Sequence, residues 1–268
     1  MAQFSVSRNR HYGPNNTDLH EIMMLGDQFG NIINTFGAAS NVPIADGLLT
    51  GYEGVHKFGG VYGTASANMS TLWTAADTTA TILYDWTYTD GPVTVVSTNS
   101  GDTTDVTIQG LDSNYDFVEE VFTLTGTSPT AAGSVNFTRV NRVFMNDETN
   151  LGKIQIKRGT TVVSEIGVGF GQTLQAFYTV PRNRTAYLMN LSASGSKNQV
   201  VDLFLFQRPF GGAFRVNTTM SLNQSNQILE FPVPIKFTEK TDIDVRIRGS
   251  ANATVSCDFT MLVVDNGA

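Results

Sequence analysis

The chain has 268 residues, enough for one large β domain or two ordinary ones. Only 15% of its residues are charged, against about 25% in typical soluble domains, and threonine (33) and asparagine (21) supply much of the polarity instead. This composition excludes a disordered chain, a coiled coil and a collagen. The single cysteine, Cys257, excludes a disulfide framework, and apolar runs such as Leu203–Phe206 are too short for a membrane span.

Charge is unevenly distributed along the chain. Residues 1–136 carry 14 acids and 3 bases, a net charge of −11, whereas residues 137–268 carry 10 acids and 14 bases, a net charge of +4. This split indicates either two β domains with different surfaces, or an acidic module that projects outward and a basic one that packs on an acidic partner. Nucleic-acid binding is not expected, because the basic residues are dispersed singly and do not cluster with aromatic residues.

Residues 1–60 are interpreted as an N-terminal arm or connector, because they show no sustained periodicity of hydrophobic residues. A short helix is predicted at residues 17–25, where Asp18 could cap its N-terminus, and glycine-punctuated turns follow. An arm without a core of its own commonly gains order by lying on a neighbouring subunit.

Residues 61–171 are predicted to form an acidic β-sandwich, since short strand candidates alternate with polar turns. The strand candidates in this region are residues 79–88, 93–97, 106–110, 117–125, 153–157 and 162–168. Hardly any helical period is present.

Residues 172–268 give the strongest pattern and predict a second, jelly-roll-like β-sandwich of seven or eight strands. Ile243, Val245 and Ile247 alternate with charged residues, and the alternation at residues 255–263 places Cys257 on the buried face. The segment Phe231-Pro232-Val233-Pro234-Ile235 has to be an edge or bent strand, because proline cannot donate to the hydrogen-bond ladder. The strand candidates are residues 173–180, 185–191, 200–207, 214–222, 228–237, 243–247 and 255–263.

No catalytic constellation is present in the sequence, so an enzyme is not expected and no cofactor is implied. The three histidines, His11, His20 and His56, form no HExxH motif or other zinc-ligand spacing. The chain also contains no Gly-x-Ser-x-Gly nucleophile elbow. Two carboxylates for glycosidase chemistry occur by chance in any β protein of this size.

One weak metal candidate is the segment Asp112-x-Asn114-x-Asp116, which matches the first three ligand positions of a calcium-binding EF-hand loop. The sixth position is Phe117 instead of glycine, and helical flanks are absent. A hairpin tip rich in Asp and Asn is the simpler interpretation. Asp102 and Asp105, on the preceding turn, could add ligands if the loops converge.

Three aromatic residues, Tyr84, Trp86 and Tyr88, share strand parity if residues 79–88 form a strand. On an exposed face they could stack on a glycan or on another subunit. On a buried face they would belong to the core of the first sandwich.

Three segments carry a resemblance to a known group of proteins: VTIQGLDSNYDFVEEVFTLTG (106–126), FTRVNRVFMNDETNLGKIQI (137–156) and QTLQAFYTVPRNRTAYL (172–188). Their turns and strand rhythm resemble virion structural proteins of tailed bacteriophages, commonest among marine phages and cyanophages. The resemblance covers about a third of the chain and includes no catalytic signature or motif with assigned residue roles. It implies a capsid decoration, a head fibre or a tail-associated protein, assembled in the bacterial host cytoplasm and located in the virion.

The sequence therefore predicts a non-enzymatic structural component of a phage particle, attached to the outside of the capsid or tail as a homo-oligomer. A trimer is expected, because trimers are the commonest fibre state, and the partners would be capsid or tail proteins. The alternative is a carbohydrate-binding or host-receptor-binding module of the tail that recognises a host surface glycan.

Overall fold

The computed structural model describes residues 6–12, 19–26, 32–33, 42–62, 68–77, 83–87, 89–196, 200–223, 225–249 and 253–267. Within these residues it contains eighteen strands, one four-residue α-helix and one short 3-10 helix. The all-β prediction is therefore confirmed. The chain divides into two compact units, residues 1–53 and 54–268.

The first unit contains an antiparallel sheet of three strands, β1 (Val6–Tyr12), β2 (Leu19–Gly26) and β3 (Ile32–Ile33), followed by α1 (Val42–Ala45). The helix predicted at residues 17–25 is wrong over its described part, since β2 occupies it. β2 pairs with β1 from Leu25 opposite Val6 to Leu19 opposite Tyr12. The β1–β2 ladder satisfies more backbone hydrogen bonds than a short helix over residues 17–25 could, because short isolated helices are only marginally stable in water. Asp18, the predicted cap, lies outside the described residues.

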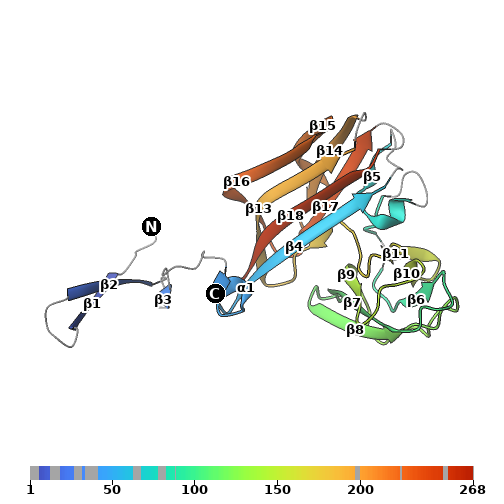
Figure 1. The fold of residues 1–268 in the computed structure, drawn as a ribbon, viewed down its shortest axis with the longest axis horizontal. Helices are drawn as coiled ribbons and strands as arrows, with labels where there is room; N and C mark the ends of the chain where they lie inside the picture. The colour runs from blue at the N-terminus through green and yellow to red at the C-terminus, as the bar shows by residue number, and fades with distance from the viewer. Residues whose placement is uncertain are drawn as a thin grey trace. The chain divides into compact units, whose positions relative to one another are not determined.

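The second unit contains a sandwich of two sheets, hereafter the sandwich (Figure 1). One sheet has the order β12-β17-β14-β15, with β5 also paired to β17, and the other has the order β16-β13-β18-β4. The strands are β4 (Tyr52–Val61), β5 (Ser70–Thr71), β12 (Phe177–Thr179), β13 (Arg184–Gly195), β14 (Val200–Arg208), β15 (Arg215–Asn223), β16 (Asn226–Phe237), β17 (Asp242–Gly249) and β18 (Val255–Asp265).

The sandwich core follows from the two-residue period of its strands. Ile243, Val245 and Ile247 of β17 are fully buried, and Phe259 of β18 packs in the same core. Cys257 faces inward as predicted, with 2% of its surface exposed. Burial, together with the neighbouring Asp258 carboxylate, raises the pKa of the Cys257 thiol.

Cys257 is accordingly expected to be inert in the folded protein, because a thiolate is the reactive form and solvent cannot reach the sulfur. An aromatic disulfide reagent at pH 8 should release no chromophore from native protein and one equivalent per chain in concentrated urea. Fast, stoichiometric reaction of the native chain would contradict the inward orientation.

β16 lies at the end of its sheet, which confirms that the two-proline segment belongs to an edge strand. Its pairing with β13 is interrupted between Leu188 opposite Ile235 and Asn190 opposite Glu230. Pro232 and Pro234 fall in this interruption, where the missing N–H groups remove no ladder bond. Val233 between them is 84% exposed. An edge of this kind is a poor template for pairing with another sheet.

The chain contributes to the sandwich before and after residues 89–171. β4 lies beside β18, and β5 pairs with β17, so these two early strands complete sheets built mostly from the C-terminal third. The short 3-10 helix η1 (Thr74–Asp77) follows. Trp73 and Tyr84 then extend the buried hydrophobic cluster of the sandwich, and Trp73 packs against Phe177 with ring centroids 5.9 Å apart.

Residues 89–171 have a separate hydrophobic core and form what we call the β6–β11 module. Its two three-stranded sheets have the orders β11-β10-β6 and β8-β7-β9. The strands are β6 (Thr94–Ser97), β7 (Asp105–Leu111), β8 (Phe117–Thr123), β9 (Arg139–Met145), β10 (Ile154–Arg158) and β11 (Thr161–Ile166). Fully buried side chains from both sheets, among them Ile108, Val143 and Ile156, meet in this core.

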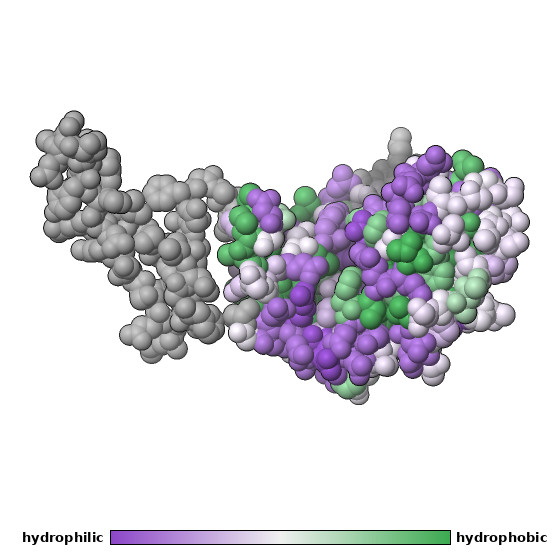
Figure 2. Space-filling model, turned by 90° about the horizontal axis from the view of Figure 1, so that it is seen from below, coloured by the Kyte–Doolittle hydropathy of each residue, from purple (hydrophilic) through white to green (hydrophobic). Residues whose placement is uncertain are grey.

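Polar side chains cover much of the surface. On the face shown in Figure 2, hydrophilic residues predominate and hydrophobic residues form separate small groups. None of the helices in the described ranges is long and apolar enough to cross a membrane.

Candidate functional site

Tyr84 and Trp86, considered from the sequence as part of a contact face or of a core, do not lie on a strand. Tyr84 is 3% exposed and Trp86 6% exposed, and both pack against Phe177 of β12 in the buried hydrophobic cluster that includes the sandwich core. Their rings meet edge to face, with centroids 4.7 Å apart. Tyr88 lies outside the described residues. Tyr84 is thus a core residue, whereas Trp86 also reaches the pocket described below.

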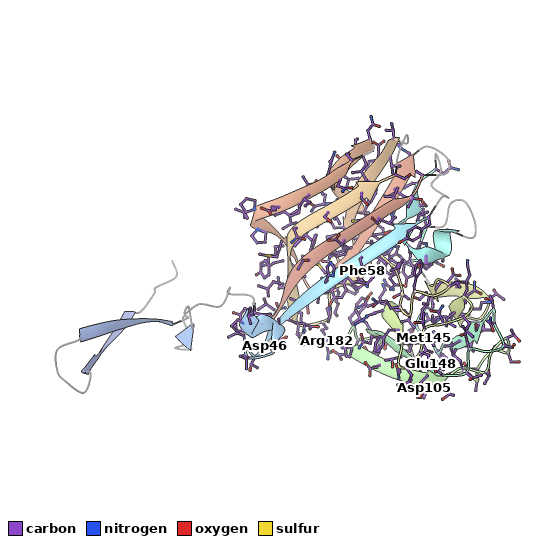
Figure 3. All side chains as sticks on the ribbon, viewed as in Figure 1. Asp46, Phe58, Asp105, Met145, Glu148 and Arg182 are labelled. Carbon is purple, nitrogen blue, oxygen red and sulfur yellow. The ribbon has the colours of Figure 1, made fainter. Side chains whose placement is uncertain are left out.

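The calcium candidates Asp112, Asn114 and Asp116 lie at the tip of the β7–β8 hairpin, where the two aspartates already accept hydrogen bonds. Asp112 Oδ1 accepts from the backbone N–H groups of Asn114 (2.8 Å) and Asp116 (2.9 Å), which closes an Asp-type turn. The Asp116 carboxylate accepts two bonds from Arg182, at 3.0 and 2.7 Å. Arg182, labelled in Figure 3, follows β12, so its pair with Asp116 ties the hairpin tip to the sandwich.

Asp102 and Asp105 hold turns within the β6–β11 module. Asp102 is buried and accepts bonds from Ser97 Oγ (2.5 Å) and from the backbone N–H groups of Leu151 (2.7 Å) and Gly152 (2.9 Å). Asp105 accepts from Thr123 Oγ1 at 2.6 Å. The described residues include no group of three or more His, Cys, Asp or Glu side chains placed to hold a metal ion.

We expect no calcium binding at the hairpin tip, because a cation would have to displace Arg182 and the turn bonds of Asp112. Calorimetric titration of the intact chain with millimolar calcium should give only the heat of dilution. A saturable signal that is lost in Asp112→Ala would show instead that the loop is a calcium site.

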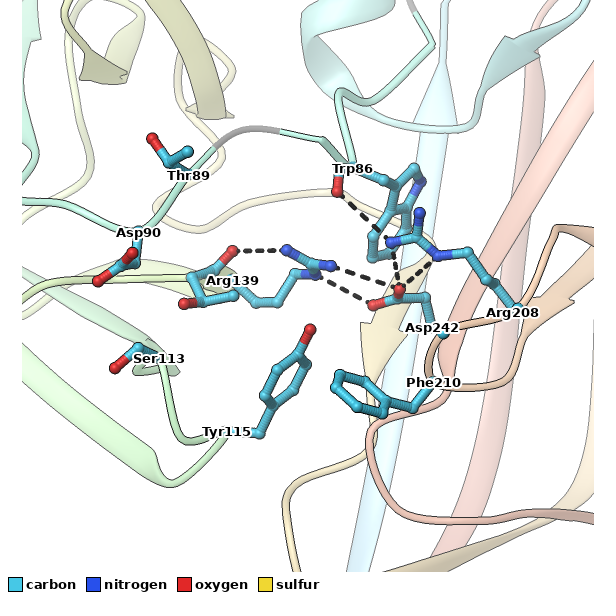
Figure 4. Close-up of a pocket in the computed structure, with 12 residues that line it drawn as sticks. Trp86, Thr89, Asp90, Ser113, Tyr115, Arg139, Arg208, Phe210 and Asp242 are labelled. Carbon is cyan, nitrogen blue, oxygen red and sulfur yellow. Dashed lines mark hydrogen bonds and ion pairs between the residues drawn. The ribbon is translucent and has the colours of Figure 1, made fainter.

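A pocket of about 510 Å³ opens where the β6–β11 module meets the sandwich (Figure 4). Pockets at such junctions are common ligand sites, and this volume falls within their usual range of about 300–1,000 Å³. The module contributes Thr89, Asp90, Ser113, Tyr115, Thr138 and Arg139 to the lining. The sandwich side contributes Trp86, Arg208, Phe210, Gly211, Gly212 and Asp242.

Asp242 is the centre of the polar network that lines the inner wall of this pocket. Arg139 Nε donates to Asp242 Oδ1 at 3.0 Å, and Arg208 Nε donates to Oδ2 at 2.9 Å. Thr179 Oγ1 donates a further bond to Oδ1 at 2.6 Å. The side chains of Asp242 and Arg139 are only 4% and 5% exposed. One buried carboxylate therefore binds a guanidinium from each side of the junction.

The local folding explains how these groups come together. Arg208 ends β14 and lies opposite Asp242 at the start of β17, and Thr179 lies opposite Asp242 from β12. These three positions face away from the sandwich core on neighbouring strands. Arg139 begins β9 in the module and lies opposite Leu111 of β7. Its guanidinium stacks 5.2 Å from the centroid of the Trp86 ring.

A second buried carboxylate fixes the position of Trp86. Asp244 accepts from Trp86 Nε1 at 3.0 Å, from Arg246 Nε at 2.7 Å and from Thr71 Oγ1 at 3.4 Å. Burial raises the pKa of Asp244, and Arg246 and the other two donors only partly offset this effect. The indole ring is thereby held with one face toward the arginines of the pocket wall.

Tyr115 occupies the pocket rim in a backbone conformation that bulky residues rarely adopt, with φ at +66°. Its N–H donates to Asp112 O at 2.9 Å, and its carbonyl accepts from Arg182 N–H at 2.9 Å. The Tyr115 ring meets the Phe210 ring edge to face, 5.6 Å apart, and Lys240 Nζ lies 5.6 Å from the Tyr115 centroid. Strain of this kind persists where surrounding contacts hold it, often at ligand sites.

Another buried polar cluster joins β4 to β9. Lys57 Nζ donates to Asn141 O at 2.5 Å, and the same oxygen accepts from Gln175 Nε2 at 2.8 Å. Ser164 Oγ donates to Gln175 Oε1 at 2.7 Å. Burial, with a contribution from the Arg142 charge, lowers the pKa of Lys57 to about 7.

Sequence reasoning did not identify the pocket residues other than Trp86. The alternation of polar and apolar residues places Arg208 and Asp242 on the polar faces of their strands, which is the one indication that the sequence gives. Nothing in the sequence pairs them with Arg139. Phe210 lies in a loop, and Tyr115 was seen only as part of a hairpin tip.

Comparisons with known proteins yielded weak structural similarity. No protein-family model and no curated protein sequence matches the chain. A structure of infectious bursal disease virus, Gt strain, is 11% identical over 82% of this chain and 74% of that chain, with a TM-score of 0.24. The VP2 subviral particle of the same virus is 12% identical over 81% of this chain and 68% of that chain, with a TM-score of 0.22. Values this low do not establish a common fold, so no residue role is transferred.

Proposed function

We propose that this chain is a non-enzymatic structural component of a virus particle, attached as a homo-oligomer to the outside of the capsid or tail of a tailed bacteriophage. The sequence resemblance to virion structural proteins of such phages supports this proposal. So does a surface poor in charge and rich in hydroxyl and amide groups, which can be buried between subunits without desolvating many ions.

The observation that carries the proposal is the strand order of the sandwich. With β5 set aside, its strands in chain order are β4 and then β12 to β18, and the chain crosses to the other sheet after every strand except β14, as in a jelly roll. The first, eighth, third and sixth strands form one sheet, and the second, seventh, fourth and fifth form the other. Jelly rolls recur in viral capsid proteins and in lectins.

The parts of the chain receive separate roles in this proposal. Residues 1–51, which precede β4, act as an arm that lies on a neighbouring subunit, and the basic C-terminal part of the sandwich, residues 172–268, packs on the particle. The acidic β6–β11 module, residues 89–171, projects outward. Deleting residues 1–41, which leaves β4 intact, should abolish incorporation into particles; unchanged incorporation would refute the anchoring role of the arm.

The oligomeric state tests the homo-oligomer directly. We expect size-exclusion chromatography with light scattering to give a trimer for the intact chain, as in a fibre or decoration protein. A ring of five, six or twelve copies would instead indicate a position at a capsid vertex or in a tail collar. A monomer at micromolar concentration would contradict self-assembly of the isolated chain.

A second candidate function, a carbohydrate-binding or host-receptor-binding module of the tail, is favoured by the pocket. Its combination of aromatic rings, hydroxyl groups and a fixed polar wall suits a hydroxyl-rich ligand.

A further inference from the structure

We infer that the pocket between the β6–β11 module and the sandwich binds a neutral saccharide. This inference rests on the second candidate function and goes beyond it, because it assigns the site, the class of sugar and the residues that contact it. It does not depend on the virion role, which particle incorporation tests separately.

The charge of the lining sets the class of ligand. Two cations, Arg139 and Arg208, and two carboxylates, Asp90 and Asp242, line the pocket. Asp242 already neutralises much of both guanidinium groups at distances of 2.5 to 3.0 Å. An anion would have to compete with a buried carboxylate for the same donors, and a strong cation would face two arginines. A neutral ligand with many hydroxyl groups pays neither cost.

The outer wall supplies groups that suit sugar hydroxyls. The side chains of Thr89, Asp90 and Ser113 line the pocket and have no hydrogen bond to another described residue. All three residues are exposed. Figure 4 shows Asp90 and Ser113 on the module side, across from Asp242 and Phe210. A carboxylate accepts bonds from two neighbouring hydroxyls, and a serine or threonine hydroxyl can donate or accept.

Aromatic rings supply an apolar surface for the C–H face of a sugar. Phe210 is 63% exposed, so its ring is accessible to a ligand, and its position is set by Tyr115 on one side. Lys240 Nζ lies 5.0 Å from the Phe210 centroid and so packs against the same pair of rings. The strained backbone of Tyr115, tied to Asp112 and Arg182, keeps this rim in place before any ligand arrives.

The test uses saturation-transfer NMR on the intact chain with methyl glycosides of glucose, galactose, mannose and N-acetylglucosamine. Glucuronic acid serves as the acidic comparison. We expect at least one neutral glycoside to receive saturation and to bind with a measurable Kd, and glucuronic acid to bind more weakly than the matching glucoside.

Two variants locate the site. Phe210→Ala and Asp90→Ala should each weaken binding by about tenfold, since each removes one stacking or hydrogen-bonding partner. The matched controls are Phe117→Ala, a 60% exposed phenylalanine on β8, and Asp147→Ala, an exposed carboxylate in the same module. Both controls should bind as the unmodified chain does, and all four positions are exposed enough for the variants to fold.

Three outcomes would overturn the inference, and each has a different consequence for the proposed functions. Preferential binding of glucuronic acid would refute the neutral class but keep a sugar site. Equal losses in Phe117→Ala and Phe210→Ala would place sugar binding outside this pocket. No saturation of any neutral glycoside would refute both the inference and the carbohydrate-binding candidate, while leaving the virion role to its own test.

Discussion

Replacing Asp242 by alanine is expected to lower the free energy of unfolding by about 3–5 kcal/mol, the usual cost of removing one partner from a buried ion pair. The substitution leaves the guanidinium groups of Arg139 and Arg208 without their shared carboxylate, and Arg139 has little access to water. Because these arginines come from opposite sides of the junction, the β6–β11 module should also loosen on the sandwich. Urea unfolding followed by circular dichroism measures the first effect, and limited proteolysis within residues 86–90 measures the second.

The matched control is Asp202→Ala, on the same two strands. Asp202 of β14 pairs with Arg248 of β17 at 3.4 Å, but both side chains are well exposed. Its loss should cost no more than about 1 kcal/mol, as for other surface pairs. Equal effects of the two substitutions would mean that burial of Asp242 adds nothing, and the junction would then depend on other contacts.

Lys57 should make the stability of the protein rise with pH above neutrality. Its pKa is about 7 in the folded protein, against 10.5 for an ordinary lysine, so between these values the unfolded chain binds one more proton than the folded chain. The free energy of unfolding then rises with pH by about 1.4 kcal/mol per unit within that window. Below about pH 7 both states are protonated, and the contribution no longer changes.

Lys57→Met is the variant that isolates this effect. It removes the titrating group and leaves Asn141 O with its bond from Gln175, so no buried acceptor loses all its donors. We expect its stability to vary less between pH 7 and 9.5 than that of the unmodified chain, by about 3 kcal/mol. Urea midpoints measured at both pH values give the comparison, and parallel pH profiles would show that Lys57 is charged in the folded state.

The strands of the C-terminal part were predicted closely, because each of them buries one face and so alternates between apolar and polar residues. Residues 200–207 and 228–237 were expected as strands, and β14 and β16 cover Val200–Arg208 and Asn226–Phe237. β9 was missed because Arg139 and Asn141 are polar yet buried, so its pattern does not alternate. The strand expected at residues 79–88 is absent over the described residues 83–87, where Trp86 depends on Asp244 for its position.

The pocket could not be predicted because its residues come from five separate stretches of the chain. Local patterns report the face on which a side chain lies, not which distant segment faces it. The link between Arg139 and Asp242 depends on how the β6–β11 module meets the sandwich. Asp116 illustrates the same limit: its spacing resembled a calcium loop, but its partner is Arg182.

The pairing of early with late strands has a consequence for synthesis on the ribosome. β4 lies beside β18, so its sheet cannot be completed until nearly the whole chain has been translated. The β6–β11 module needs no later residues for its own core and is free to fold first. Until β18 has been translated, the edges of β4 and β13 that pair with it remain unpaired. Unpaired strand edges make the nascent chain prone to aggregation. In chains stalled on the ribosome before residue 255, the folded β6–β11 module should therefore resist protease, whereas the incomplete sandwich should be digested.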